Sequence, residues 1–598
     1  MMRVADYITK FIYDLGVRDI FMLTGGGAMF LNDAAAQNKN IRGIFNHHEQ
    51  ASAMGAFAYS KYTENWGAAY LTTGCGATNA ITGLMDAWQD NVPVLFISGQ
   101  VKRADTIWKM GLPLRQYGVQ EVEVIPIVQS LSKYSVMVTD PLKIRYHLEK
   151  AAYLATTGRP GPVWLDIPMD VQGAPVDEES LESFNPNELT PEYKTEAQQD
   201  ELQKLEALLK EAKRPVIIAG HGVRLAHAIP EFRAFIEQYN IPFVGTYLAT
   251  DYVPGDHPLF IGRTGLKGDR AGNFAMQNSD LIISIGSRLG VTVIGYDYKQ
   301  FAREAKIAVI DIDPFEHQKK TLEIDLFINA DAKKFLTDFH PQNLSDFRQW
   351  QQQCLTWKEN YPVCLPQYQN SQEGINLYYF MDELSKNLPP DSVVVADAGS
   401  AIYVPAQGFK ATSNQRLILS GAQAEMGFTI PACIGISAAR KNGEVVGITG
   451  DGSFQTNLQE LQTIVEYKLP VKLFVWNNNG YLSIRSTQNR IFEGRLYGTD
   501  ASNGVSLPDT KKIAEAYSIA YVKLEGNENL GERIKKVLDM KGPVICEVMC
   551  IEDQEIVPTV SSKKLDDGRM ISKPLEDMYP FLDREEFKKQ MLIKPLEE

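Results

Sequence analysis

Short apolar runs recur along the chain and predict buried parallel strands. Five of them are rich in Val and Ile and are bounded by Gly, Pro or Asp; they cover residues 92–99, 214–222, 280–287, 306–313 and 392–399. The stretches between such runs are long enough to form helices. Strands that alternate with helices in this way are typical of parallel sheets with helices on both faces. The pattern therefore predicts an α/β fold throughout.

Two polar segments divide this pattern into three blocks. Residues 183–201 are polar and contain proline, and a second polar stretch covers residues 342–374. We therefore expect three doubly wound domains, at residues 1–180, 195–340 and 370–560. The tail, residues 561–598, has mixed charge and scattered aromatic residues, unlike a disordered tract. Both an arm that closes over an active site and a scaffold against a neighbouring subunit fit this tail.

Composition and charge argue against several classes of protein. The 598 residues are 44% hydrophobic and carry a formal net charge of −14, which argues against nucleic acid as the main partner. No apolar run reaches the length of about 18 residues that a membrane span needs. Residues 1–17 resemble an amphipathic helix rather than a signal peptide. The six cysteines form no CxxC pair, so a reducing cytoplasm fits better than a disulfide framework or a zinc site.

Residues 444–480 predict a strand–helix–strand unit with polar residues at both ends. Asp451 lies between Gly450 and Gly452 after the first apolar run, and Asn477 and Asn478 follow the second. Because the two strands are parallel, both polar ends should meet at the carboxyl edge of one sheet, where α/β proteins bind ligands. Carboxylate, amide and backbone carbonyl oxygens suit Mg²⁺, whose remaining positions usually go to phosphate oxygens and water. Flanking glycines let the backbone approach a phosphate closely.

The same unit resembles the diphosphate–metal motif of thiamine diphosphate (ThDP) enzymes, because GDG is followed after 24 residues by NN. Longer segments resemble the acetolactate synthase large subunit family; they cover residues 45–61, 72–101, 158–172, 305–314, 420–435 and 458–480. The resemblance extends over about residues 1–550. It implies a pyrimidine-binding N-terminal domain, a central domain, a diphosphate-binding C-terminal domain and a C-terminal arm.

The resemblance also implies a set of residues that bind the cofactor. Asp451, Asn478 and Gly480 would hold Mg²⁺, which anchors the diphosphate. Glu49 would protonate the pyrimidine nitrogen N1′, and Met426 would force the cofactor into its bent conformation. The backbone of Ala424, a position that is glycine in many relatives, would accept a hydrogen bond from the 4′-amino group. Further cofactor contacts are expected from Gly399, Ser400, Gly450, Gly452 and Ser453.

Other positions match residues that lie near the substrate in the synthases. They are Gly26 and Gly27 in TGGGAMF, Gln120 in YGVQE, Lys133, and Arg288 in GSRLG. Gln120 is also a candidate catalytic residue, and Arg288 could face an anionic group of the acceptor. Thr487 stands where the synthases place a tryptophan that shapes the acceptor pocket. A small polar residue at this position predicts a roomier and more hydrophilic pocket.

The resemblance implies that a 2-keto acid, pyruvate above all, loses CO₂ and that its two-carbon unit is transferred to a second carbonyl. Two acceptors stay open: another pyruvate, as in acetolactate synthase, or a keto sugar, including nucleotide-linked ones, which would give a branched-chain sugar. A simple decarboxylase is not expected, because Ile484 occupies the position of the proton-transferring glutamate of pyruvate decarboxylases. An inactive ThDP-fold binding protein is the alternative from another class. The presence of Glu49, Asp451 and Asn478 argues against it.

Two further expectations concern FAD and assembly. Residues 262–276 resemble the flavin-contact segment of the synthases, but residues 288–296 lack both aspartates of the acidic run that follows in that family. FAD therefore stays open. The resemblance implies a homodimer or homotetramer, in which Glu49 of one subunit meets Asp451 of another. The segments GGGAMF (25–30) and GHGVR (220–224) are too incomplete to count as dinucleotide motifs, and His47 and His48 have no partner at zinc spacing.

Overall fold

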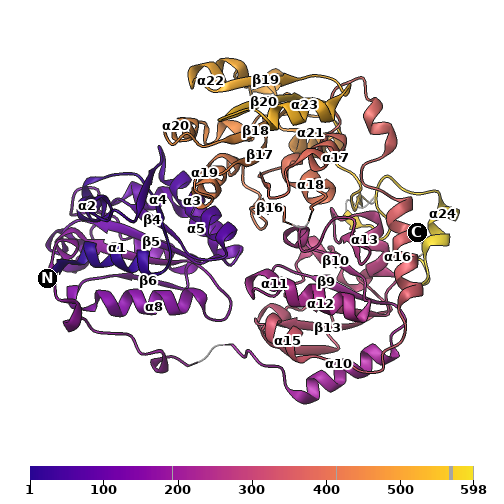
Figure 1. The fold of residues 1–598 in the computed structure, drawn as a ribbon, viewed down its shortest axis with the longest axis horizontal. Coiled ribbons are helices and arrows are strands. Elements are labelled where there is room, and N and C mark those ends of the chain that lie inside the picture. Colours follow the sequence, from indigo (N-terminus) through magenta and orange to yellow (C-terminus); the bar gives the residue numbers. More distant parts are fainter. Residues whose placement is uncertain (191–192, 413, 565–569, 597–598) are drawn as a thin grey trace.

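The computed structural model describes residues 1–190, 193–412, 414–564 and 570–596. Three parallel sheets of six strands each form the centres of three lobes, which Figure 1 colours indigo, magenta and orange in chain order. The predicted α/β fold with three doubly wound domains is confirmed. Residues 191–192 of the expected linker, and 565–569 and 597–598 of the expected C-terminal arm, lie outside the described residues.

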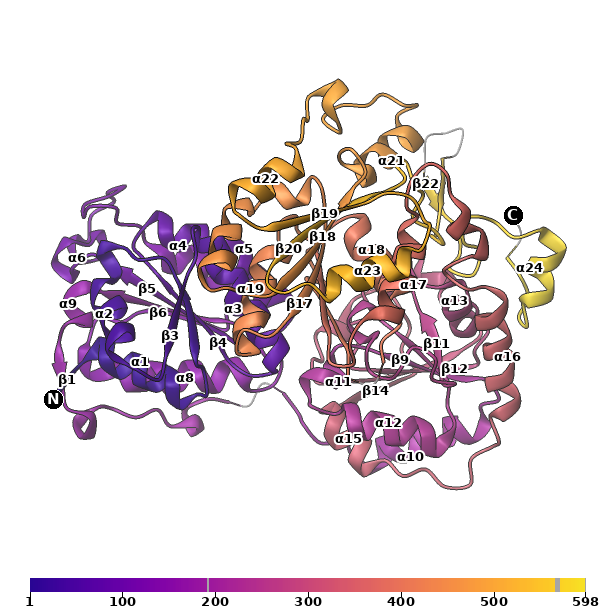
Figure 2. The same cartoon turned by 45° about the horizontal axis from the view of Figure 1, so that its top comes forward.

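The N-terminal sheet takes its strands in the order β3-β2-β4-β5-β7-β6. Its strands are β2 (Asp19–Met22), β3 (Arg42–Phe45), β4 (Gly67–Leu71), β5 (Val94–Gln100), β6 (Tyr134–Met137) and β7 (Val163–Pro168). β4 and β5 are buried along their whole length, as their unbroken apolar sequences predict for strands covered on both faces. Helices α3 (Glu49–Thr63) and α5 (Ile81–Gln89) lie on the side facing the C-terminal lobe (Figure 2).

The central sheet has the order β11-β10-β9-β12-β13-β14. Its strands are β9 (Pro215–Ala219), β10 (Phe243–Gly245), β11 (Phe260–Arg263), β12 (Leu281–Ile285), β13 (Lys306–Asp311) and β14 (Leu326–Asn329). The strand order reverses between β9 and β12. The carboxyl ends of these two strands therefore form a switch point, the place where open parallel sheets bind their ligands.

The C-terminal sheet has the order β16-β15-β17-β18-β20-β19. Its strands are β15 (Val393–Ala396), β16 (Arg416–Leu419), β17 (Val445–Gly450), β18 (Val471–Asn477), β19 (Ala520–Leu524) and β20 (Val544–Met549). β17 and β18 are parallel neighbours, so the predicted strand–helix–strand unit is correct in topology. Its α-helix is short and covers only α20 (Leu461–Glu466). Asn457 leaves the helical conformation (φ −133°), and its side chain donates to the Gly427 carbonyl at 2.9 Å.

One seam joins the N-terminal and C-terminal domains. Helix α3 packs against α19 (Thr429–Ala439), and a Cβ atom added to Gly435 would lie 2.2 Å from the carbonyl oxygen of Gly55. The rings of Phe57 and Phe428 pack beside this contact with centroids 5.6 Å apart. The two domains consequently share one continuous hydrophobic core.

The segments after the central sheet pack back onto the central domain. Helix α16 (Arg348–Asn360) lies within the polar stretch expected to separate two domains, and its Trp350 donates from Nε1 to the Pro215 carbonyl at 3.0 Å. The arm returns to the same face with α24 (Arg584–Gln590), as Figures 1 and 2 both show. Glu576 of the arm pairs with Arg303 at 2.7 Å. The described part of the arm thus lies against the central domain of its own chain. No helix among the described residues combines the length and apolar character that a membrane crossing requires.

Candidate active site

The carboxyl edge of the C-terminal sheet carries a buried carboxylate. Asp451 directly follows β17 and is 5% exposed. Its oxygens accept two backbone N–H bonds, from Gly452 at 2.8 Å and from Gly480 at 3.0 Å. Burial raises the pKa of Asp451 to about 6, although these N–H groups act in the opposite direction. A carboxylate in such surroundings is a favourable place for a bound cation.

The loop after β18 lies against this carboxylate, since its Gly480 N–H donates to Asp451. The side-chain Oδ1 of Asn478 is buried and, among the described residues, has no hydrogen-bond partner. Buried Arg485 donates to the Asn478 carbonyl at 2.8 Å and so fixes the loop. Gly480 has φ +128°, and a Cβ there would lie 2.1 Å from the Thr499 carbonyl, so only glycine fits. An unpartnered amide oxygen beside a buried carboxylate fits Mg²⁺, which takes oxygen ligands.

The next part of the same edge is suited to an anion. β15 is followed by Gly399 (φ +57°) and by helix α18 (Ser400–Gly408), whose first backbone N–H groups lack partners within the helix. A Cβ added to Gly450 would meet nothing within 4 Å, so open space lies beside this glycine. Ser453 donates from Oγ to Asp397 Oδ2 at 2.7 Å, which ties the turn after Asp451 to the end of β15.

The loop after β16 brings Ala424 and Met426 to this edge. The Gly427 N–H donates to Ser453 Oγ at 2.9 Å, which joins the loop to the turn described above. Ala424 has φ +53°, a conformation that glycine adopts more easily. Met426 is 39% exposed, an unusual position for a large apolar side chain beside buried polar groups. Both features are expected where a loop is shaped around a ligand.

Glu49 is the first residue of α3 and is 6% exposed. Its Oε2 accepts a hydrogen bond from Asn79 Nδ2 at 2.9 Å, and the start of a helix favours a carboxylate. The turn before it is fixed by the C-terminal domain, because Glu460 accepts hydrogen bonds from Asn46 Nδ2 at 3.0 Å and from the His47 N–H at 2.9 Å. Burial and a single oriented donor are the surroundings that a carboxylate needs for proton transfer.

Family models match all three domains. Thiamine pyrophosphate (TPP) is another name for ThDP. The model of the N-terminal TPP binding domain matches residues 2–132, and that of the TPP enzyme central domain matches residues 202–339. The model of the C-terminal TPP binding domain matches residues 397–548. The acetolactate synthase large subunit of Lactococcus lactis subsp. lactis is 33% identical over 93% of this chain and 94% of its own. The chain belongs to the thiamine pyrophosphate enzymes.

Within these enzymes, it is similar to other acetolactate synthase large subunits as well. The isozyme 2 large subunit of Escherichia coli is 31% identical over 94% of this chain and 97% of its own. The probable large subunit of Methanocaldococcus jannaschii is 31% identical over 94% of this chain and 93% of its own. The predicted recognition as a ThDP enzyme of the acetolactate synthase type is confirmed, and so is the prediction of a transferase.

In this TPP enzyme, three of the expected substrate residues lie at the carboxyl edge of the N-terminal sheet, the edge that also carries Glu49. Gly27 packs so closely that an added Cβ would lie 1.7 Å from Thr73 Oγ1, whereas Gly26 has open space. Gln120 is exposed with φ +62°, and its carbonyl packs against Gly74, the residue that ends the turn after β4.

The other three expected substrate residues lie elsewhere. Lys133 donates to the carbonyls of Thr157 at 2.6 Å and Arg159 at 2.7 Å, away from the edge that carries Glu49. Arg288 lines a cavity of the central domain. Thr487 is exposed on helix α21 (Leu482–Ile491), which starts just after Gly480. Thr487 therefore lies close to the loop that carries Asn478 and Gly480, whereas Lys133 and Arg288 lie elsewhere.

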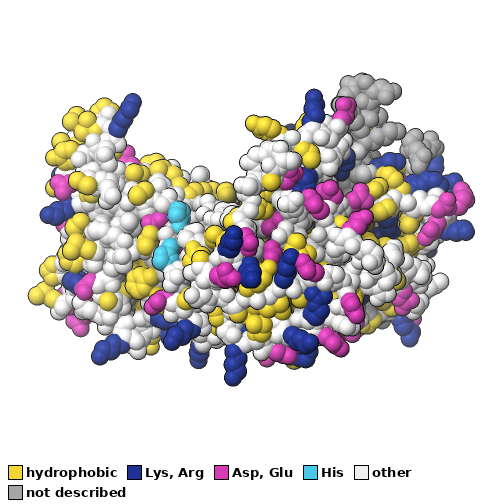
Figure 3. All heavy atoms as spheres, turned by 90° about the horizontal axis from the view of Figure 1, so that it is seen from above, with side chains coloured by type: hydrophobic (Ala, Val, Ile, Leu, Met, Phe, Trp, Pro, Cys, Tyr) yellow, Lys and Arg dark blue, Asp and Glu magenta, His cyan; other side chains and the backbone are white. Residues whose placement is uncertain are grey.

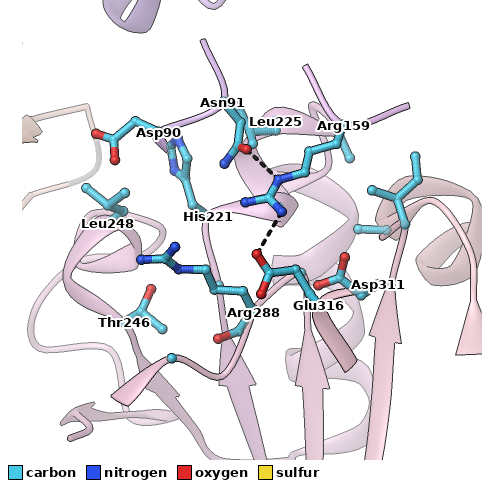
Figure 4. A pocket seen from close by; sticks show the side chains of 18 of the residues that line it. Asp90, Asn91, Arg159, His221, Leu225, Thr246, Leu248, Arg288, Asp311 and Glu316 are labelled. Atoms are coloured by element: carbon cyan, nitrogen blue, oxygen red, sulfur yellow. Dashed lines mark hydrogen bonds and ion pairs between the residues drawn. The ribbon is translucent and has the colours of Figure 1, made fainter. Parts of the chain in front are cut away.

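The central domain of this TPP enzyme contains an open cavity at the carboxyl ends of β9, β12 and β13 (Figure 4). Arg159 of the N-terminal domain reaches its rim, where Nη1 lies 2.8 Å from both Asp313 and Glu316. Burial acts to raise the pKa of Glu316, but hydrogen bonds from Lys319 and Arg159 outweigh it and lower the pKa to about 2. The side chains of His221, Thr246 and Arg288 lie around the same space.

Sequence reasoning missed several residues that shape these sites. Asn79 lies in the TTGCGATN segment, and only the position of Glu49 in the fold reveals their contact. Glu460 lies 414 positions after Asn46 in the chain, so its contact with residues 46–47 has no local sequence signal. The GHG of residues 220–222 was set aside as a motif, yet it lines the central cavity just after β9. A short Gly-rich turn at the end of a central strand is the signal that could have identified it.

Proposed function

We propose that the chain is a ThDP- and Mg²⁺-dependent carboligase of the acetolactate synthase type. It decarboxylates a 2-keto acid, with pyruvate as the first candidate, and transfers the two-carbon unit to a second carbonyl. The observation that carries the proposal is the pair of buried Asp451 and unpartnered Asn478 Oδ1 at one sheet edge. The names of the similar proteins support the reaction type.

ThDP, when bound, supplies the nucleophilic carbon to which the 2-keto acid adds. In the proposed site, Asp451, Asn478 and Gly480 hold Mg²⁺, and the N-terminus of α18 binds the diphosphate through backbone N–H groups. Glu49 would exchange a proton with the pyrimidine ring, and Asn79 orients its Oε2. Met426 would offer the cofactor an apolar surface, and the Ala424 carbonyl would accept a hydrogen bond from its amino group.

We further propose that the active enzyme is a homodimer or a larger homo-oligomer. Figure 3 shows a broad hollow beside the N-terminal lobe, with hydrophobic side chains exposed on that lobe. One loop of that domain exposes six large apolar side chains: Trp108, Met110, Leu112, Leu114, Tyr117 and Val119. Val119 alone is 83% exposed. An exposed apolar run of this kind is typical of a surface that another protein covers.

A keto sugar is the second candidate acceptor, and Thr487 is the observation that favours it. Its side chain is small and its Oγ1 donates to the Ser483 carbonyl of the same helix at 2.9 Å. The exposed face of α21 beyond Gly480 therefore leaves room for a larger, more polar acceptor than pyruvate.

The cavity of the central domain is our candidate site for FAD or another nucleotide. Its place at a switch point suits such a ligand, and Arg288 and Arg159 provide cationic groups at its rim. The missing acidic pair after Arg288 argues against the flavin contacts of the synthases. The visible absorption spectrum of the purified enzyme tests this point: a colourless protein with full activity would exclude FAD.

A product assay with pyruvate, ThDP and Mg²⁺, which follows CO₂ and acetolactate together, tests the proposed function. Rapid formation of acetolactate would establish pyruvate as donor and acceptor. Slow loss of pyruvate that a nucleotide-linked keto sugar accelerates would establish the sugar as acceptor. A protein that binds ThDP but turns over none of a panel of 2-keto acids would be a binding protein, and the proposal would fail.

A further inference from the structure

The loop of residues 420–427, which presents Ala424 and Met426, is attached to the N-terminal domain by one face of α5. Asp90 accepts the backbone N–H groups of Gly421 at 3.0 Å and Ala422 at 3.1 Å. Gln89 accepts a hydrogen bond from Gln423 Nε2 at 2.5 Å. Asp86, one turn earlier on the same helix, lies next to Ser420, with 3.5 Å between the hydroxyl and Oδ1. The position of the loop therefore depends on the end of α5.

Two carboxyl groups meet at the centre of this attachment. Asp86 is 1% exposed, and Glu425 comes from the loop itself, immediately before Met426. The Ser420 hydroxyl lies between them, 3.5 Å from Asp86 Oδ1 and in hydrogen-bond contact with Glu425 Oε2, so the two carboxyl groups interact directly. Each has one buried oxygen, Asp86 Oδ2 and Glu425 Oε1, that has no hydrogen-bond partner among the described residues. The second oxygen of Glu425 accepts a hydrogen bond from Ser420 Oγ.

Among the described residues, no positively charged side chain forms an ion pair with Asp86 or Glu425. Lys61 of α3 lies 2.5 Å from Asp90 and donates to the Leu419 carbonyl at 2.6 Å, so its charge reaches Asp86 only through space. Asp90 adds a third carboxylate nearby. On the side of the central domain, burial lowers the pKa of His221 and keeps it neutral. Two carboxylates this close and this buried cannot both ionise cheaply.

We propose that Glu425 is a positioning residue, which shares one proton with Asp86 and thereby holds the 420–427 loop in the geometry that presents Ala424 and Met426. The proton fills the two oxygens that otherwise lack partners and removes the repulsion between the carboxylates. The inference rests on the proposed function, because that function assigns Ala424 and Met426 to the cofactor. Burial, followed by repulsion between the carboxyl groups, raises the pKa of Asp86 well above its usual range, and burial raises that of Glu425 to about 7.

The direction of the pH dependence follows from these shifts. Both carboxyl groups have higher pKa values in the folded chain than in the unfolded one. At pH values between the unfolded and the folded pKa, the folded chain therefore binds more protons. The pair's contribution to the free energy of unfolding is therefore fully present below the ordinary carboxyl pKa. It is lost as the pH rises through about 7. Above that pH the loop loses its attachment through Asp86, and binding of ThDP should weaken with it.

The experiment uses the full-length chain and the variants Glu425→Gln, Glu425→Ala and Asp86→Asn. Glutamine keeps a donor for Asp86 without a titrating group. We expect the unfolding temperature of the unliganded wild type to fall by a few degrees between about pH 5.5 and 8, and that of Glu425→Gln to fall by less than half as much. The infrared band of a protonated carboxyl group at neutral pH should be weaker in Glu425→Gln than in the wild type. Glu528→Gln, the same change at an exposed glutamate, is the control and should leave both readouts as in the wild type.

The second readout is the ThDP concentration that gives half-maximal activity near pH 6.5. Glu425→Ala should raise it about tenfold, whereas Glu425→Gln should stay within about threefold of the wild type and keep this value at higher pH. The proposal is overturned if Glu425→Gln and Glu425→Ala behave alike, or if Glu425→Gln leaves the infrared band and the pH slope of unfolding unchanged. The unfolding and infrared measurements need neither ThDP nor turnover. They therefore decide the shared proton even if the proposed carboligase activity is absent.

Discussion

At the scale of single residues, Glu49 offers the sharpest test of the proposed chemistry. It is buried, and Asn79 is its side-chain partner. Glu49→Gln keeps the shape and the contact but removes the exchangeable proton, so we expect kcat/KM to fall by at least about 100-fold. The rate of CO₂ release from pyruvate measures kcat/KM. An unfolding temperature equal to that of the wild type would show that the variant is folded. Asn79→Ala should cost less, because it affects only the orientation of the carboxylate. Activity of Glu49→Gln near the wild-type level would show that another group moves the proton.

Asn478 allows an equally direct test of the metal site. Its buried Oδ1 has no protein partner among the described residues, so its loss should affect a bound cation more than the fold. We expect Asn478→Ala to raise the Mg²⁺ concentration for half-maximal activity by about tenfold or more. A titration of apo-enzyme with Mg²⁺ at saturating ThDP measures the change. Asn479→Ala, at the exposed neighbouring position, is the matched control. Equal effects of the two variants would contradict the assignment of the ligand.

At the scale of elements, helix α21 should determine the acceptor. It begins two residues after Gly480, and Thr487 lies on its exposed face. Thr487→Trp fills the space beside the loop that carries Asn478 and Gly480. We therefore expect the ratio of product formed with pyruvate as acceptor to product formed with a keto sugar to rise by about tenfold. Product analysis with both acceptors present measures the ratio. Ser486→Trp adds the same bulk one position earlier, about 100° around the helix, and should leave the ratio unchanged. A ratio that responds to neither substitution would remove α21 from the acceptor pocket.

The elements also show why part of the architecture could be predicted and part could not. Runs of Val and Ile bounded by Gly, Pro or Asp signal buried strands, and all five predicted strands are present. The Asp451–Asn478 arrangement follows from the same logic, since parallel strands end at one edge. The extent of the helix in the unit of residues 444–480 could not be predicted, because hydrophobic periodicity does not register the hydrogen bond of the Asn457 side chain. The packing of α16 on the central domain was missed because two tryptophans in a polar stretch give too weak a pattern.

At the scale of the whole molecule, contacts between segments that are distant in the chain could not be predicted from the sequence. Asp86 and Glu425, or Asn46 and Glu460, belong to different domains, and no local pattern links them. Arg159 likewise reaches the central cavity from the N-terminal domain. The domain order and the meeting of Asp451 and Asn478 at one sheet edge could be predicted, because they depend on local patterns. The contacts that position Glu49 and Met426 could not be predicted, because they depend on how the domains pack.

Co-expression of Glu49→Gln and Asn478→Ala chains tests whether a site is shared between subunits. If each site takes Glu49 from one chain and Asn478 from its partner, half of the dimers are mixed and each contains one intact site. We expect about a quarter of the wild-type activity, from two variants that are nearly inactive alone. Co-expression of two differently tagged Glu49→Gln chains gives the baseline. Activity no higher than that baseline in purified mixed dimers would mean that each chain builds its own site.

The seam between α3 and α19 limits how this enzyme can be altered. At Gly55 and Gly435 the two helices touch backbone to backbone, and a methyl group on Gly435 would lie 2.2 Å from a carbonyl oxygen. Gly83 on α5 is equally closed, with Ala53 atoms 2.6 Å from an added Cβ. Directed evolution towards new acceptors would therefore accumulate its changes on α21 and around Gly26, where added atoms meet open space. The glycine positions of the seam should stay fixed through every round of selection.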